Sequence, residues 1–179
     1  MYVVLLRGIN VGKAKRVPMA DLRVILAELG CTQVTTLLNS GNAVVVAPGT
    51  TTRALAESVA EALRVKFGFE VAVVVKSGEE LKGIIEGNDL AGAATDPSRL
   101  LVAFGQDGAA LASLHPLEAL VVPPESFLLN GNAAYLHCAN GILASKAAEA
   151  LLGKLGRAIT TRNWATVLKL HALAQDSAT

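Results

Sequence analysis

Apolar and polar residues alternate along the first part of the chain in a pattern that predicts a strand and then a helix. Residues 3–7 form a short apolar run typical of a buried strand. Pro18 stands at a helix-start position, and apolar residues recur at helical spacing from Met19 to Leu29. Gly30 follows as a left-handed helix end. This segment therefore predicts a helix with one buried face.

The pattern continues with a hairpin, a second helix and a fourth strand. Residues 34–38 and 43–47 flank the polar turn NSGN, whose Asn and Gly residues tolerate the positive φ angles of tight turns. Thr51 or Thr52 caps the next helix, and residues 71–75 form another strand. The order β-α-β-β-α-β is that of a ferredoxin-like unit.

A trailing helix and a linker separate this unit from the rest of the chain. Ser77 and Glu80 form a capping box that starts the helix. Residues 87–98 are rich in Gly, Asn, Asp, Ser and Pro and predict a linker. We therefore expect a first lobe at residues 1–86 and a second lobe at residues 99–179.

The second half repeats the pattern of the first. LLNGNAAYL at residues 128–136 resembles LLNSGNAVV at residues 37–45, which favours internal duplication, although Asn-Gly hairpins also recur by chance. The other expected elements are a strand at 100–104, a helix from Asp107 to Leu114, a helix at 142–155, a strand at 158–161 and a helix from Asn163. The sequence thus predicts an α+β protein with two ferredoxin-like lobes.

Composition narrows the class of protein. With 179 residues and 52% hydrophobic content, the chain can bury a stable core. Cys31 and Cys138 are isolated, so neither a disulfide framework nor a metal site is predicted, and no cofactor is indicated. The apolar runs are too short for a membrane helix, and polar residues interrupt any signal-peptide core. We expect a cytoplasmic protein that does not enter the membrane.

Charge is distributed unevenly. Residues 1–20 carry four bases and no acid, and residues 126–179 carry five bases and two acids. Residues 53–125 instead carry six bases and eleven acids. If the fold brings the basic ends together, their field favours an anionic partner, whereas the alternative is an ordinary solvated surface.

The loop RGINVGK is the first candidate site. Its two glycines can expose backbone amides, and Arg7, Asn10 and Lys13 could assist in binding an anion. The spacing of the glycines is one residue short of a phosphate loop, and Ala14 replaces the Ser or Thr of that motif. The alternative is a strand-to-helix connection that needs glycine for its turns.

Two further polar motifs are candidates. In TTRNW, a helix start beside Thr161, Arg162 and Asn163 would attract phosphate or carboxylate; alternatively, a threonine caps the helix and Arg162 lies in solvent. In NSGN, the side chains of the motif could orient a ligand or serve only the turn. The polar residues of that motif are Asn39, Ser40 and Asn42. No catalytic acid–base pair or activated nucleophile can be named.

These three motifs carry a family resemblance. RGINVGKAKRVPM, LLNSGNAVVV and TTRNWATVLKL, in this order, resemble the bacterial family known as domain of unknown function 1697. Members usually read RGINVGG, so Lys13 departs from the pattern, as does Val46 where an aromatic residue is common. The resemblance implies a bacterial α+β protein and brings no assigned activity.

The motifs and charge together favour a binding function. We expect an anionic small molecule, such as a nucleotide or phosphorylated metabolite, at a site where RGINVGK and TTRNW converge. Nucleic-acid binding ranks lower because only 4% of residues are aromatic, and an interaction or structural role is the remaining alternative. The sequence predicts neither a reaction nor an oligomeric state.

Overall fold

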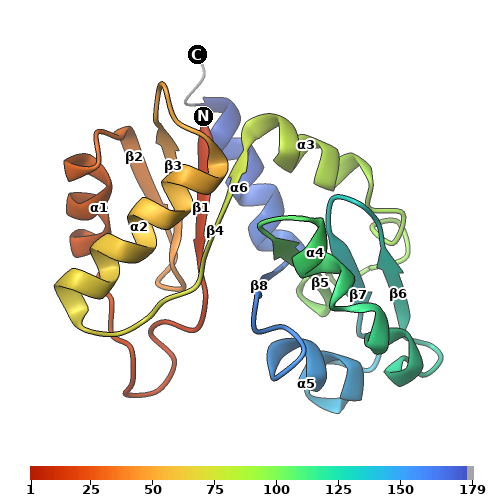
Figure 1. The fold of residues 1–179 in the computed structure, drawn as a ribbon. Helices are drawn as coiled ribbons and strands as arrows, with labels where there is room; N and C mark the ends of the chain where they lie inside the picture. The colour runs from red at the N-terminus through yellow and green to blue at the C-terminus, as the bar shows by residue number, and fades with distance from the viewer. Residues whose placement is uncertain (177–179) are drawn as a thin grey trace. The chain divides into compact units, whose positions relative to one another are not determined.

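The computed structural model describes residues 1–176 and contains two compact lobes, each built around a four-stranded antiparallel sheet (Figure 1). Met1–Leu81 and residues 170–176 form the first lobe, and Lys82–Lys169 form the second. The divisions therefore fall inside two helices, α3 (Gly78–Glu86) and α6 (Trp164–Asp176). The predicted linker at residues 87–98 lies within the second lobe, where it consists of turns and bends followed by the start of the 3₁₀ helix Pro97–Arg99.

The first lobe has the predicted β-α-β-β-α-β order. Its elements are β1 (Tyr2–Leu6), α1 (Met19–Glu28), β2 (Thr32–Leu37), β3 (Asn42–Val46), α2 (Thr52–Phe67) and β4 (Val73–Ser77). The strands lie in the order β2-β3-β1-β4, and every neighbouring pair is antiparallel. This is the ferredoxin-like arrangement that the sequence predicts.

The second lobe repeats this arrangement. Its elements are β5 (Leu100–Gly105), α4 (Gly108–Ala112), β6 (Ser126–Leu129), β7 (Ala134–His137), α5 (Lys146–Leu152) and β8 (Ile159–Asn163). The strand order β6-β7-β5-β8 corresponds strand for strand to that of the first lobe. The fold class of two ferredoxin-like lobes in an α+β protein is confirmed.

Each lobe buries one face of its sheet under its own helices. In the first lobe, Val4, Leu6 and Val45 pack against apolar residues of α1 and α2, and all are buried. In the second, Leu101 and Leu136 pack against residues of α4, α5 and the 3₁₀ helix His115–Leu120. Alternate strand residues face the helices, as the two-residue period of a strand requires.

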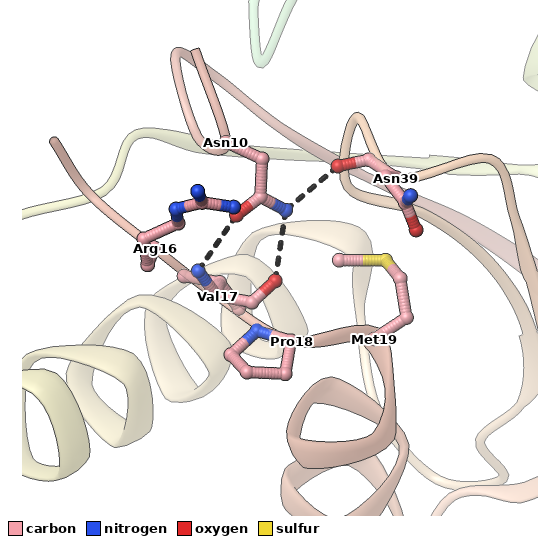
Figure 2. Close-up of a pocket in the computed structure, with 6 residues that line it drawn as sticks. All are labelled: Asn10, Arg16, Val17, Pro18, Met19 and Asn39. Carbon is pink, nitrogen blue, oxygen red and sulfur yellow. Dashed lines mark hydrogen bonds between the residues drawn. The ribbon is translucent and has the colours of Figure 1, made fainter. Parts of the chain in front are cut away.

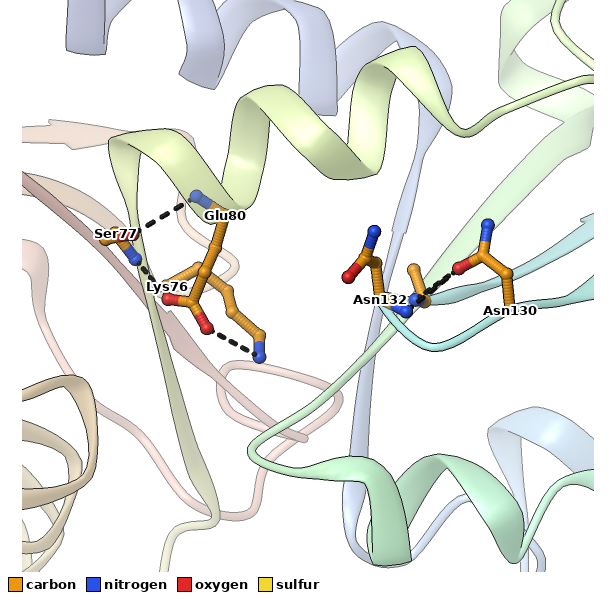
Figure 3. A network of polar contacts seen from close by, with 6 residues as sticks. Lys76, Ser77, Glu80, Asn130 and Asn132 are labelled. Atoms are coloured by element: carbon orange, nitrogen blue, oxygen red, sulfur yellow. Dashed lines mark hydrogen bonds and ion pairs between the residues drawn. The ribbon is translucent and has the colours of Figure 1, made fainter.

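Local capping explains where several helices begin. The Thr51 hydroxyl accepts a hydrogen bond from the Ala54 N–H at 3.1 Å and starts α2. The Ser77 hydroxyl accepts from the Glu80 N–H at 3.1 Å, and the Ser77 N–H donates to the Glu80 carboxylate at 2.7 Å (Figure 3). This reciprocal pair is the predicted capping box. The buried Lys76 is ion-paired with the same carboxylate at 3.4 Å.

Several boundaries differ from the sequence prediction. β4 begins two residues later than expected and ends at the capping residue of α3 itself. In the second lobe, α4 is only five residues long and gives way to the 3₁₀ helix, while α5 begins after its own cap, Ser145. β8 runs on to Asn163, so the final helix begins one residue later than predicted.

The hairpin of the second lobe is fixed by Asn130. Its side-chain oxygen accepts hydrogen bonds from the Asn132 and Ala133 N–H groups at 2.9 and 3.0 Å, and Figure 3 shows the first of these bonds. Its amide nitrogen donates to the Gly87 carbonyl at 3.2 Å. Nearby, the Tyr135 hydroxyl donates to the Ile84 carbonyl at 2.6 Å. These bonds hold the C-terminal half of α3 against the second sheet.

Candidate functional site

The loop between β1 and α1 has an irregular backbone. Gly8, Asn10, Gly12 and Lys15 all have left-handed φ angles between 49° and 64°. The Asn10 N–H donates to the Lys15 carbonyl at 3.1 Å, which closes the loop on itself. Asparagine tolerates this conformation better than most side chains, so the sequence suits the bend at position 10.

The side chain of Asn10 makes three hydrogen bonds (Figure 2). Its oxygen accepts from the Val17 N–H at 2.9 Å, and its amide nitrogen donates to the carbonyls of Val17 at 2.8 Å and Asn39 at 2.7 Å. Both amide hydrogens are therefore engaged by main-chain oxygens. Asn10, which the sequence predicts as a ligand contact, joins the β1–α1 loop to the hairpin between β2 and β3.

A pocket of about 410 Å³ lies beside this junction. Figure 2 shows Asn10 at its rim, the Arg16 guanidinium and Asn39 on either side of Asn10, and Pro18 and Met19 below. The residues that line it are Asn10, Arg16, Val17, Pro18, Met19 and Asn39. All belong to the first lobe, and Asn10 and Asn39 are the predicted site residues that line it.

Arg16 supplies the charge of the pocket. Its side chain is exposed and makes no hydrogen bond or ion pair with any residue from 1 to 176. Lys15, by contrast, donates to the Glu70 carbonyl at 2.8 Å. Lys13 is exposed in the same loop but does not line the pocket, and Arg7 lies at the end of β1, where its N–H donates to the Ala72 carbonyl at 2.9 Å.

Helix α1 begins at the pocket without a side-chain cap. Its N-cap is Pro18, and the first bond of the helix runs from the Leu22 N–H to the Pro18 carbonyl at 3.1 Å. Helix geometry leaves the N–H groups before Leu22 without partners inside the helix. The acid of the first turn, Asp21, is ion-paired with Lys66 at 3.0 Å. This end of α1 is therefore electropositive.

The other two predicted site residues of the NSGN motif, Ser40 and Asn42, stabilise the turn. Asn42 is fully buried, and its amide nitrogen lies 2.9 Å from both the Leu37 carbonyl and the Ser40 hydroxyl. Neither Ser40 nor Asn42 lines the pocket. The positive φ angles of the turn fall at Leu38 and Gly41, and not at its asparagines.

The TTRNW motif lies at the junction where β8 ends and α6 begins. Arg162 is half-buried in β8, and its guanidinium donates to the Thr160 hydroxyl at 3.0 Å and the Thr161 carbonyl at 2.9 Å. Burial lowers the pKa of Arg162 to about 10, so the side chain stays charged at neutral pH. Asn163, and not Thr161, caps α6, accepting from the Thr166 N–H at 2.9 Å. The interpretation of Arg162 as a solvent-exposed residue is therefore wrong.

The sequence prediction missed Arg16, Val17, Pro18 and Met19. The available signal was a proline helix start with a base two residues before it, which leaves an uncapped helix end near a positive charge. The same pattern also marks an ordinary helix boundary. The pocket also depends on the contact between Asn10 and Asn39. These residues are 29 positions apart, so a local sequence pattern cannot predict the contact.

Other kinds of site find little support in the part of the chain that the structure describes. No three His, Cys, Asp or Glu side chains of residues 1–176 gather where they could hold a metal ion. Cys31 and Cys138 are buried free thiols, and burial raises the pKa of both. Among the described helices, none has both the length and the apolar character needed to cross a membrane.

Comparison with known proteins places the chain in a family. Residues 1–135 match the family described as "Protein of unknown function (DUF1697)". The chain belongs to the DUF1697 family. The predicted resemblance is confirmed, and the matched span contains RGINVG and NSGN but ends before TTRNW.

The fold of this DUF1697 protein also matches a solved structure. The conserved bacterial protein SP0830 from Streptococcus pneumoniae is similar with a TM-score of 0.81 and 25% sequence identity, over 97% of each chain. The two-lobe arrangement is therefore shared along nearly the full length of both proteins. No curated protein matches the chain.

Proposed function

We propose that the protein binds an anionic small molecule, such as a nucleotide or a phosphorylated metabolite, in the pocket between the β1–α1 loop and the β2–β3 hairpin. The observation that carries the proposal is Arg16, an exposed cation without a partner among residues 1–176, which lines a pocket of about 410 Å³. A guanidinium offers paired N–H donors that suit phosphate or carboxylate oxygens. A volume of this size lies within the usual range for small-molecule sites.

Two neighbouring features support an anion rather than a cation or neutral ligand. The uncapped start of α1 adds main-chain donors and the positive end of a helix dipole. The first 20 residues carry four bases and no acid, and the nearby Asp21 is already ion-paired with Lys66. An anion in the pocket would therefore meet little opposing charge.

Nucleic-acid binding on the face of a sheet receives less support. RNA-recognition sheets stack bases on exposed aromatic side chains. Here Phe104 and Tyr135, the aromatic residues of the central strands of the second sheet, are fully buried. The first sheet has Tyr2 on β1, whose hydroxyl donates to the Thr50 carbonyl at 2.7 Å and whose ring packs against the helix-covered core. The small anion remains the better proposal.

The wider site predicted from the sequence remains part of the proposal. Arg162 and the other residues of TTRNW belong to the second lobe. The guanidinium of Arg162 would suit the same class of anion. Under this proposal, Arg162→Ala weakens the ligand by about 1.5–3 kcal/mol in addition to any effect on stability.

Two broader inferences accompany this function. The identical strand orders and the four-residue turns of both hairpins support an internal duplication. The two buried, unpaired thiols suit a reducing compartment, and we place the protein in the bacterial cytoplasm.

Calorimetric titration with AMP, ribose 5-phosphate and a short RNA tests the proposed function. We expect a phosphorylated small molecule to bind, and Arg16→Ala to weaken it by about 1.5–3 kcal/mol, roughly a ten- to hundredfold loss. Arg157→Ala removes the same charge from an exposed position in the second lobe and serves as the matched control. Equal affinity of the two variants, or binding of RNA alone, would contradict the proposal.

A further inference from the structure

Asn10 is the pocket residue whose side chain bonds to two separate segments of the first lobe. One segment is the loop that carries Arg16, and the other is the hairpin turn that carries Asn39. The Asn10 amide bonds to Val17, the residue after Arg16, through both its oxygen and its nitrogen. The same nitrogen also bonds to the main chain of Asn39.

We infer that Asn10 is a positioning residue that holds Arg16 and Asn39 at fixed separation and so keeps the pocket formed before any ligand arrives. The inference rests on the proposed function for its binding consequence, while its structural consequence concerns the free protein. Its amide hydrogens already have main-chain acceptors, so Asn10 itself contributes no donor to a ligand. It acts on binding only through its neighbours.

The physical reason lies in the cost of ordering a loop. The segment 8–16 contains two glycines and mostly exposed residues, and without a tie it would sample many conformations. A ligand that had to order this loop would lose affinity, whereas a loop ordered in advance loses little. Lys15 contributes two bonds to that order, one to the Asn10 N–H and one to the Glu70 carbonyl. The three hydrogen bonds of the Asn10 side chain add the ties to Val17 and to the hairpin, at a left-handed φ of 56°.

Two substitutions separate the parts of this arrangement. Asn10→Gly accepts the left-handed backbone and removes all three bonds. Asn10→Asp keeps the oxygen that accepts from the Val17 N–H but removes both donors. Asn140→Gly, at an exposed loop position of the second lobe, is the matched control for the added glycine flexibility.

Amide hydrogen exchange in the free protein provides the first measurement. We expect the Val17 amide to exchange at least about tenfold faster in Asn10→Gly and to remain largely protected in Asn10→Asp. Core amides of β1 and β3 should be unchanged in both variants. Unchanged Val17 exchange in Asn10→Gly would show that other contacts hold the loop, and the inference would be wrong.

Titration with AMP provides the second measurement. We expect Asn10→Gly to bind about tenfold more weakly than the wild type, although Arg16 is intact, and Asn140→Gly to bind normally. Full affinity in Asn10→Gly despite a loosened loop would overturn the positioning role. Absence of binding by the wild type to AMP, ribose 5-phosphate and inorganic phosphate would instead overturn the proposed function, and with it the binding part of the inference.

Discussion

The two lobes share one strand order but differ in the region between the first helix and the hairpin turn. Each lobe has a pocket beside its first helix and its hairpin turn, of about 410 Å³ in the first and 260 Å³ in the second. In the first, Arg16 has no partner among residues 1–176. In the second, Asn130 is engaged by the main chain and His115 lies 3.4 Å from Glu118. The shared topology therefore produces a pocket in both lobes. In the described part of the chain, only the first of the two pockets has a charged side chain that is free to bind a ligand, and this makes it the candidate site.

The hairpin turns show the same divergence. Both contain four residues between strands, since Leu37 pairs with Asn42 and Leu129 pairs with Ala134. The first turn uses left-handed residues at both ends, whereas no residue of the second has a positive φ. Counted along the ladders, Asn130 corresponds to Leu38, so the asparagines that look alike in sequence are offset by one position.

Replacing Trp164 should have the largest effect on stability. It tests whether the two junctions between the fourth strand and the following helix, β4–α3 and β8–α6, are packed alike. The first residue of α6 is Trp164, only 7% exposed, and the corresponding first residue of α3 is Gly78. We expect Trp164→Ala to lower the free energy of unfolding by about 3–5 kcal/mol through the cavity it leaves. Denaturant unfolding followed by circular dichroism measures the loss.

The counterpart Gly78→Ala should be neutral or slightly stabilising. An added Cβ there would meet its nearest neighbour, the Met1 Cβ, only at 4.0 Å. Alanine is also favoured over glycine in a helix by roughly 0.5–1 kcal/mol. A loss at Gly78→Ala as large as that at Trp164→Ala would show that the two junctions are packed alike.

The next largest effect concerns the residue before the third strand of each lobe. A Cβ on Gly41 would lie 2.6 Å from the Leu6 Cβ and 2.9 Å from the Ile9 Cδ1, at a φ of 79°. We expect Gly41→Ala to cost about 2–4 kcal/mol. The corresponding residue of the second lobe is already Ala133, and Ala133→Gly should cost only about 1 kcal/mol. Similar losses from both substitutions in urea unfolding would refute this asymmetry.

The smallest effects should be equal in the two lobes. Ser77 and Asn163, each the last residue of a fourth strand, accept a hydrogen bond from the N–H three residues later. We expect Ser77→Ala and Asn163→Ala each to cost about 1 kcal/mol. Amide hydrogen exchange should become faster by a similar factor in the first turn of α3 for Ser77→Ala and in the first turn of α6 for Asn163→Ala. A negligible effect at either site would mean that this helix start relies on packing alone.

Local signals explain which parts of the fold the sequence predicts well. The Ser77–Glu80 capping box and the cap at Thr51 involve residues three positions apart, and both were predicted. Gly30 follows its helix with a left-handed φ angle as expected, and Gly68 has the same conformation at the end of α2. Such features depend on a few neighbours, so the sequence pattern is sufficient.

The site depends on contacts that the pattern does not contain. The sequence predicts a threonine as the cap of α6, but Asn163 is the cap, because pairing with β5 extends β8 to Asn163. The role of Asn10 follows from its bond to Asn39, and the importance of Arg16 follows from the pocket that this bond closes. Residue type alone could identify Asn10 as a functional candidate. It could not show whether the side chain contacts a ligand or forms hydrogen bonds that hold the loop.

The bond between Asn10 and Asn39 also links the pocket to the course of folding. It joins residues 29 positions apart, so the pocket requires β1, its loop and the β2–β3 hairpin to be assembled together. Contacts of this separation are slower to form than the turns of a helix. A ligand in the pocket would thus recognise only the completed lobe, and at about 100 times its dissociation constant would favour it by about 2.7 kcal/mol over every partly folded form.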